Sequence, residues 1–164
     1  MTNGYNGNYL GPTLVLQAGT TASINVTNNL SDTTTTHWHG LHIAADNDGG
    51  PHTMIMPGAT WSPSFTVMDK AATYWYHPHL HTKTGLQVMK GAAGLIIVQD
   101  SEEAALALPR TYGVDDFPIV VQTQQLSPSN QVVVDGMRDS ITIVNGTASP
   151  YVDMPAQVVR MRCL

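Results

Sequence analysis

The chain has 164 residues, a formal net charge of −5 and only seven lysine or arginine residues. These basic residues form no cluster, which argues against nucleic acid as a partner, and no apolar run reaches the roughly 20 residues that a membrane-spanning helix needs. The opening MTNGYNGNYLGPT is polar and turn-like and does not have the pattern of a signal peptide. Cys163 is the only cysteine, which excludes an internal disulfide, and we expect it to be a buried strand thiol.

Short stretches rich in Thr, Val and Ile predict strands, which clusters of Gly, Pro, Asn and Asp separate. The predicted strands of the first hundred residues are 13–18, 21–28, 35–43, 64–68, 73–77 and 93–99. A helix is predicted over 101–108, with Asp100 as N-cap, Glu103 at its third position and Pro109 as its stop. Extended segments follow at 117–125, 141–146 and 157–164. Many short strands with regular turns indicate an all-β sandwich or barrel.

The strands divide unevenly along the chain. We expect residues 1–100 to form a complete domain, 101–113 a linker with the short helix, and 114–164 part of a second domain. About three strands in the last part are too few to close a second sandwich. Because the chain also stops inside an apolar strand-like run, we expect a fragment of a longer protein. A single β domain with three extra strands is the alternative.

Two His-x-His pairs, His37-Trp38-His39 and His77-Pro78-His79, are the strongest candidates for a functional site. Residues i and i+2 of a strand point to the same face, so each pair directs two imidazoles the same way. Two such strands side by side would bring four imidazoles together, and imidazole suits copper, zinc, iron or nickel. Exposed histidines on an edge strand are the alternative, which the repetition of the motif disfavours.

Other polar candidates stand in loops or on the opposite face. His42 should point away from the first pair, His52 lies in the DGGPH loop, and His81 extends the second pair into a turn, where a loop histidine is the better interpretation. Asp48 is either a turn former or a hydrogen-bond partner of a ligand imidazole or a metal-bound water. The pair Asp115-Asp116 is expected in a solvated turn.

The methionines allow two interpretations. Met54, Met56, Met68 and Met89 could bind Cu(I) through their thioethers, but we expect them to fill gaps in the core. No G-x-S-x-G elbow, P-loop or H-E-x-x-H motif is present in the sequence. A zinc hydrolase is conceivable from four histidines, but no carboxylate base stands at a familiar spacing.

The amino-acid sequence around the histidine pairs resembles that of a known family. THWHGLH, followed by DGGP and by WYHPHLHTKTGLQVMKGAAGLIIV, is similar to the N-terminal part of multicopper oxidases such as laccases and cuprous oxidases. YLGPTLVLQAGTTASINVTNNL resembles the opening strands of their first cupredoxin domain. YGVDDFPIVVQ and ITIVNGTASPYVDMPAQVVRMRCL resemble the entry and early strands of their second. The resemblance implies a cupredoxin-like Greek-key β-sandwich or barrel followed by an incomplete second cupredoxin domain.

The resemblance also implies roles for individual residues. His37 matches the histidine that binds type 2 copper, and His39, His77 and His79 match ligands of the type 3 copper pair. Asp48 matches an acid that hydrogen-bonds near the trinuclear centre and assists proton delivery. The family oxidises phenols, amines or Cu(I) at a type 1 copper and reduces O₂ to water at the trinuclear centre.

The chain also departs from the family pattern. The remaining four histidines of the trinuclear centre and the type 1 ligands belong to a C-terminal cupredoxin domain, and Cys163 has no adjacent histidine. We therefore expect half a trinuclear centre, no type 1 copper and no activity of the chain alone. The implied partners are O₂, a small reducing substrate, and the missing domain or another chain. The implied location is periplasmic or extracellular, and the alternative function is a stand-alone copper-binding or assembly module without oxidase activity.

Overall fold

The computed structural model describes residues 2–134 and 141–164, and the described part is all-β, as predicted. Its main sheet has the strand order β1-β8-β7-β4, in which β1 runs parallel to β8 and the other neighbours are antiparallel. The four strands are β1 (Leu14–Gln17), β8 (Gly94–Gln99), β7 (Ala72–His77) and β4 (His37–His39). Five of the six residues of β8 are buried, because neighbours cover it at both edges and on both faces.

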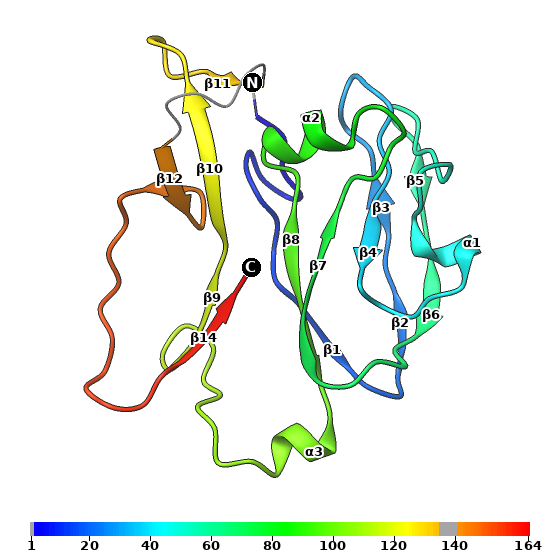
Figure 1. Ribbon diagram of the computed structural model, residues 1–164. Helices are drawn as coiled ribbons and strands as arrows, with labels where there is room; N and C mark the ends of the chain where they lie inside the picture. Colours follow the sequence, from blue (N-terminus) through cyan, green and yellow to red (C-terminus); the bar gives the residue numbers. More distant parts are fainter. Residues whose placement is uncertain (1, 135–140) are drawn as a thin grey trace.

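A second layer of short strands faces this sheet (Figure 1). It consists of β2 (Thr21–Ser23) paired with β6 (Ser64–Thr66), and β3 (Val26–Thr27) paired with β5 (Thr60–Trp61). The predicted strand 21–28 is therefore two strands, and β5 is an addition to the prediction. Between the layers lies a core built from Trp38, Leu41, Phe65, Val67, Tyr76, Ile96 and Val98. This core fixes which face of β4 and β7 turns inward.

Three short helices connect the strands: α1 (Ala45–Asp48), α2 (Thr84–Met89) and α3 (Ser101–Ala104). Asp100 caps α3 by accepting a hydrogen bond from the Glu103 amide, as predicted. The predicted extension of this helix to residue 108 is wrong. Leu106 and Leu108 are exposed, so a longer helix would gain no burial, and the Arg110 guanidinium instead binds the carbonyls of Glu103 and Leu106. None of the described helices is long and apolar enough to cross a membrane.

The strands after α3 form a separate group, to the left of β8 in Figure 1. The strand β9 (Asp116–Ile119) pairs in parallel with β14 (Arg160–Cys163). A single residue, Val120, separates β9 from β10 (Val121–Leu126). The strand β10 pairs with β11 (Val132–Val133) and with β12 (Ile141–Val144), which continues to β13 (Thr147–Ala148). The predicted strand 117–125 divides at Val120, whose amide donates to the Asn145 side chain. Residues 135–140 of the predicted second domain lie outside the described residues.

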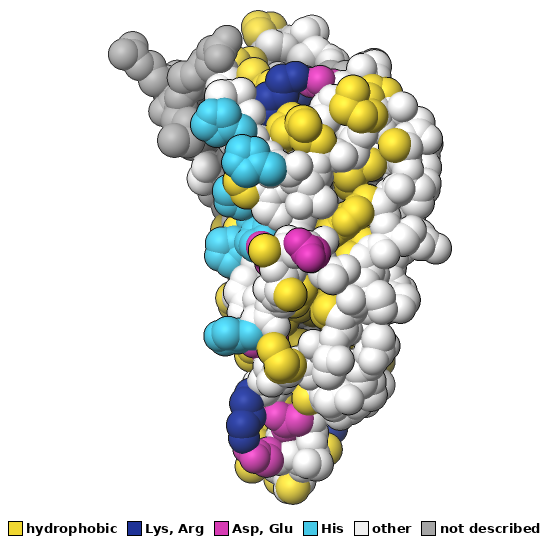
Figure 2. Space-filling view, turned by 90° about the vertical axis from the view of Figure 1, so that its right-hand side faces the viewer, with side chains coloured by type: hydrophobic (Ala, Val, Ile, Leu, Met, Phe, Trp, Pro, Cys, Tyr) yellow, Lys and Arg dark blue, Asp and Glu magenta, His cyan; other side chains and the backbone are white. Residues whose placement is uncertain are grey.

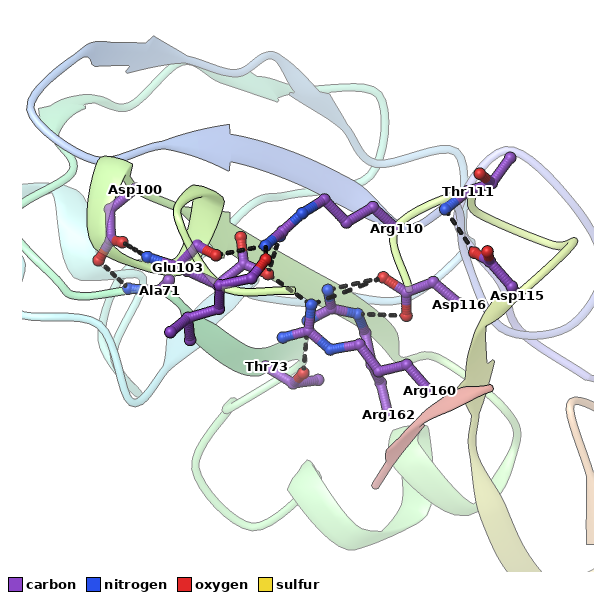
Figure 3. A network of polar contacts seen from close by, with 11 residues as sticks. Ala71, Thr73, Asp100, Glu103, Arg110, Thr111, Asp115, Asp116, Arg160 and Arg162 are labelled. Carbon is purple, nitrogen blue, oxygen red and sulfur yellow. Dashed lines mark hydrogen bonds and ion pairs between the residues drawn. The ribbon is translucent and has the colours of Figure 1, made fainter. Parts of the chain in front are cut away.

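A cluster of ion pairs links β9 and β14 to each other and to α3 (Figure 3). Asp116 and Arg162 are both buried, and the guanidinium donates two hydrogen bonds of 2.7 Å to the carboxylate. Glu103 of α3 accepts hydrogen bonds from Arg110 and Arg160. The prediction of a solvated turn at Asp115-Asp116 is therefore wrong for Asp116. The expected burial of Cys163 is also wrong, because strand alternation turns Arg162 inward and Cys163 outward.

Candidate metal centre

The pairing of β4 with β7 brings the two histidine motifs together. His37 lies opposite His77 and Trp38 lies opposite Tyr76 in the register of the two strands. Trp38 and Tyr76 turn into the core, so the histidines occupy the other face of the sheet. His79 lies two residues beyond β7, where its amide donates to the Thr35 hydroxyl at 2.6 Å. The burial of Trp38 and Tyr76 in the core thus decides on which face of the sheet the histidines lie.

The four imidazole rings are close neighbours. The ring of His37 lies 5.6 Å from His39, 5.6 Å from His77 and 5.2 Å from His79, measured between centroids. His77 lies 5.3 Å from His39 and 5.8 Å from His79. Figure 2 shows histidine side chains gathered along one edge of the view. The predicted convergence of the two motifs is therefore present in the structure.

One pair of nitrogen atoms has the spacing of two ligands of one metal ion. His39 Nδ1 and His77 Nε2 are 3.0 Å apart, which without a metal is also the length of a hydrogen bond between the two rings. Two nitrogens that each lie about 2.0–2.1 Å from one ion are separated by about 2.9–3.4 Å for ligand angles between square and tetrahedral. Among the described residues, no group of three or more His, Cys, Asp or Glu side chains meets around one ion position. Within the described residues the cluster therefore presents one facing pair of ligand nitrogens, His39 Nδ1 and His77 Nε2.

Hydrogen bonds define which nitrogen of each imidazole is free. The carbonyl oxygen of Asp48 lies 3.0 Å from His37 Nδ1, and the carbonyl of Pro78 lies 2.7 Å from His77 Nδ1. A carbonyl can only accept, so both Nδ1 atoms carry the proton and both Nε2 atoms keep a lone pair. His79 Nδ1 is buried and has no hydrogen-bond partner among the described residues. An uncompensated buried imidazole nitrogen and lone pairs on neighbouring rings fit a metal ion.

Desolvation lowers the pKa of two of these rings. Desolvation lowers the pKa of His77 to about 4, with smaller contributions from the neighbouring histidines, while the Pro78 carbonyl opposes the shift. Desolvation likewise lowers the pKa of His39, followed by the effect of His37 and His79. A neutral imidazole is the form that binds a metal, so these rings are prepared as ligands at neutral pH.

Asp48 reaches the cluster through a tight turn. It ends α1, and the following Gly49 has a left-handed φ of 75°. A Cβ atom at Gly49 would lie 1.7 Å from the Thr36 carbonyl oxygen, so only glycine allows this approach. Besides its carbonyl, Asp48 places carboxylate oxygen Oδ2 3.2 Å from His37 Nδ1. Of the two interpretations of Asp48, the structure favours a partner of an imidazole over a simple turn former.

Trp75 is a part of the cluster that the sequence analysis did not identify. Its ring stacks on His77, with centroids 4.0 Å apart and planes 29° apart, and lies 5.0 Å from the ring of His39. Trp75 lies directly opposite His39 in the strand register. Its position two residues before His77 was the available signal, because strand alternation places both on one face.

The remaining candidates lie outside the cluster. His42 lies beyond the end of β4, and its Nδ1 lies 2.5 Å from the buried Asp69 carboxylate, so its expected orientation away from the first pair stays a prediction. His52 and His81 are exposed in turns. The expected core role of the methionines is wrong for Met54, Met56 and Met68, which are 62%, 55% and 70% exposed. They lie in loops and at strand ends, where the adjacent residues Ile55 and Val67 are the buried ones.

Comparison with known proteins identifies the class. The family model described as "Multicopper oxidase" matches residues 1–103. The multicopper oxidase Mco of Staphylococcus epidermidis is 40% identical over 99% of this chain, and the cell division protein FtsP of Escherichia coli is 36% identical over 98%. The chain spans 37% and 35% of the length of these two relatives.

Solved structures of similar proteins confirm the fold. A laccase from Pediococcus acidilactici matches 99% of the chain and 37% of its own, with a TM-score of 0.93 and 38% identity. The laccase-like multicopper oxidase CueO from Ochrobactrum sp. matches 97% of the chain and 37% of its own, with a TM-score of 0.89 and 41% identity. The chain belongs to the multicopper oxidase family, and its fold is the expected cupredoxin-like all-β architecture. Copper is the cofactor that this family implies.

Proposed function

We propose that this chain is the N-terminal part of a laccase-like multicopper oxidase and supplies half of its trinuclear copper centre. The observation that carries the proposal is the pair of nitrogens, His39 Nδ1 and His77 Nε2, 3.0 Å apart within a cluster of four imidazoles. Copper bound there would supply the redox chemistry that reduces O₂ to water. The residues of this chain hold the ligand geometry, and burial favours the neutral form of His77.

The ligands divide into two roles in this proposal. His39, His77 and His79 bind the type 3 pair, supported by the facing nitrogens of His39 and His77. His37 binds type 2 copper through Nε2, because its Nδ1 is occupied by Asp48. Asp48 holds the His37 ring in this tautomer, and its carboxylate is the proposed proton donor to the centre. The type 1 site would lie in another part of the complete protein.

The same proposal includes the domain organisation of the chain, its partners and its location. Residues 1–100 form the first cupredoxin domain, 101–113 the linker, and 114–164 part of a second domain. A C-terminal cupredoxin domain or another chain completes the centre, and phenols, amines or Cu(I) are the electron donors. The family resemblance also carries the proposal that the protein works in the periplasm or outside the cell.

Copper binding by paired variants tests the proposed ligands. Replacing His37 and His79 together by Ala should reduce copper uptake to what the His39–His77 pair alone retains, measured by metal analysis after dialysis against Cu(II). The matched control replaces His52 and His81 by Ala, because both are exposed histidines outside the cluster. Unchanged uptake in the His37/His79 variant, or an equal loss in the control, would refute the assignment.

The alternative, a stand-alone copper-binding or assembly module without oxidase activity, is not favoured, because the family model and the relative at 40% identity are both multicopper oxidases. Oxidation of a phenol under O₂ by the complete protein separates the two functions. Turnover that disappears in the His37/His79 variant supports the oxidase, whereas copper binding without turnover supports the module.

A further inference from the structure

Two methionine side chains stand in solvent on the loop that follows α1. Met54 and Met56 are 62% and 55% exposed, whereas Ile55 between them is 1% exposed. A thioether side chain gains free energy from burial, so most methionines pack in cores. Two of them on one exposed segment are not explained by packing within the described residues.

The backbone holds both thioethers on the same side. Ile55 and Thr34 exchange two hydrogen bonds of 2.8 and 3.1 Å, and the buried Asn28 amide donates to the Ile55 carbonyl at 2.8 Å. In such extended backbone, residues i and i+2 point to one face and their Cα atoms lie roughly 6.6 Å apart. Each methionine has three rotatable side-chain bonds, so the two sulfur atoms can reach one point between them.

The side chains around Met54 and Met56 leave the two thioether sulfur atoms as the available ligands, and these are soft and uncharged. The Thr33 hydroxyl donates to Met56 Sδ at 3.5 Å, so this sulfur already presents a lone pair to an electrophilic partner. The nearby Asp32 carboxylate is engaged by the Lys83 ammonium at 2.6 Å. A hard divalent cation therefore finds no free carboxylate from Asp32, whereas a soft cation finds two thioethers.

We propose that Met54 and Met56 form a binding site for a soft monovalent cation, with Cu(I) as the ion that thioethers select. The site is separate from the four-histidine cluster and does not depend on its function. Because a thioether has no proton to lose, binding here should not change between pH 5 and pH 7, unlike binding to imidazole.

Silver titration of the methionine methyl groups tests the site. The purified chain carries ¹³C-methyl methionine, and the signals of its eight methionines are assigned through single Met→Leu variants. The Met54 and Met56 signals should shift together at an Ag(I) concentration at least about tenfold below that needed for Met68, since paired donors raise the effective affinity. Cu(I) under anaerobic reducing conditions should reproduce the pattern.

Two variants distinguish a cation site shared by Met54 and Met56 from independent binding at each methionine. Met54→Leu should raise the Ag(I) concentration needed to shift Met56 about tenfold, to that of Met68, because the second donor is lost. Met68→Leu is the matched control, since Met68 is 70% exposed elsewhere, and it should leave both signals unchanged. Leucine keeps the side-chain volume, and the backbone amide spectrum checks the fold.

Two results would overturn the proposal. One is a common Ag(I) response of Met54, Met56 and Met68, and the other is a Met56 response that Met54→Leu does not alter. Replacing His37 and His79 by Ala should leave the methionine response intact. A loss of that response in the histidine variant would show that the cation binds at the cluster and not at the methionines.

Discussion

The imidazoles of the proposed metal site are oriented by single neighbouring residues. Asp48 and Pro78 fix the tautomers of His37 and His77 through carbonyl oxygens. Trp75 covers the ring of His77 and borders that of His39. These contacts restrict ring rotation, so the facing nitrogens of His39 and His77 keep their 3.0 Å separation. Residues that are not proposed as ligands thus contribute to the geometry of the ligands.

Trp75→Leu should weaken copper binding at the His39–His77 pair by about 10–100-fold, the usual effect of losing a residue that orients a ligand. Trp75→Phe keeps a planar ring and should retain most of the affinity. Copper titration followed by electron paramagnetic resonance measures both variants. Equal affinities of the leucine variant and the unaltered chain would show that the stack has no positioning role.

Elements that are distant in sequence meet in the ion-pair cluster of Figure 3. Arg162 of β14 binds Asp116 of β9, and its guanidinium also lies 3.5 Å from the Thr73 hydroxyl of β7. Arg160 binds Glu103 of α3. The linker helix therefore takes part in a polar interface between the main sheet and the later strands.

Asp116→Asn should destabilise the chain by about 3–5 kcal/mol, because it leaves the Arg162 guanidinium buried without a counter-charge. Asp115→Asn is the matched control, since the Asp115 carboxylate accepts hydrogen bonds from the Thr111 amide and the Gln157 side chain at the surface. Its expected cost is within about 1 kcal/mol. Urea unfolding measures both values, and a similar loss in the two variants would contradict the buried role of Asp116.

The stability of the whole molecule depends on pH through one group in the main sheet, His77, and one in the linker helix, Glu103. Burial lowers the pKa of His77 to about 4 in the main sheet. Burial opposes ionisation of Glu103, yet hydrogen bonds from Arg160 and Arg110 outweigh it and lower the pKa of Glu103. In both cases the unfolded chain takes up a proton at a higher pH than the folded chain does.

The free energy of unfolding of the copper-free chain should therefore fall as the pH decreases. The His77 contribution is lost from about pH 6.5, the ordinary pKa of histidine, down to about pH 4. The Glu103 contribution is complete above its ordinary pKa of about 4.3 and is lost as the pH falls through its lowered folded-state pKa. Urea unfolding at a series of pH values measures both, and His77→Gln should remove the slope between pH 6.5 and 4. An unchanged slope in that variant would assign it to other groups.

Local pattern was enough for the all-β class, the two His-x-His motifs and the cap of α3, because each depends on alternation or on neighbouring residues. It was also enough to expect the two motifs side by side. It failed for the bounds of α3, whose continuation to residue 108 had no surface to cover. It failed as well for the splitting of strand 21–28, because the pairing partners of each half lie some forty residues away along the chain.

The amino-acid sequence by itself determined which residues could bind a metal and on which face of their strands they stand, since side-chain direction in a strand follows from alternation. Only the tertiary structure decided the rest. The register of β4 on β7 sets the distance between imidazole nitrogens, and the position of Asp48 depends on the close approach of Gly49 to Thr36. The burial of Asp116 with Arg162 and the exposure of Met54 and Met56 depend on which surfaces meet across the fold. Contacts of this kind join residues far apart in the chain, and no local pattern contains them.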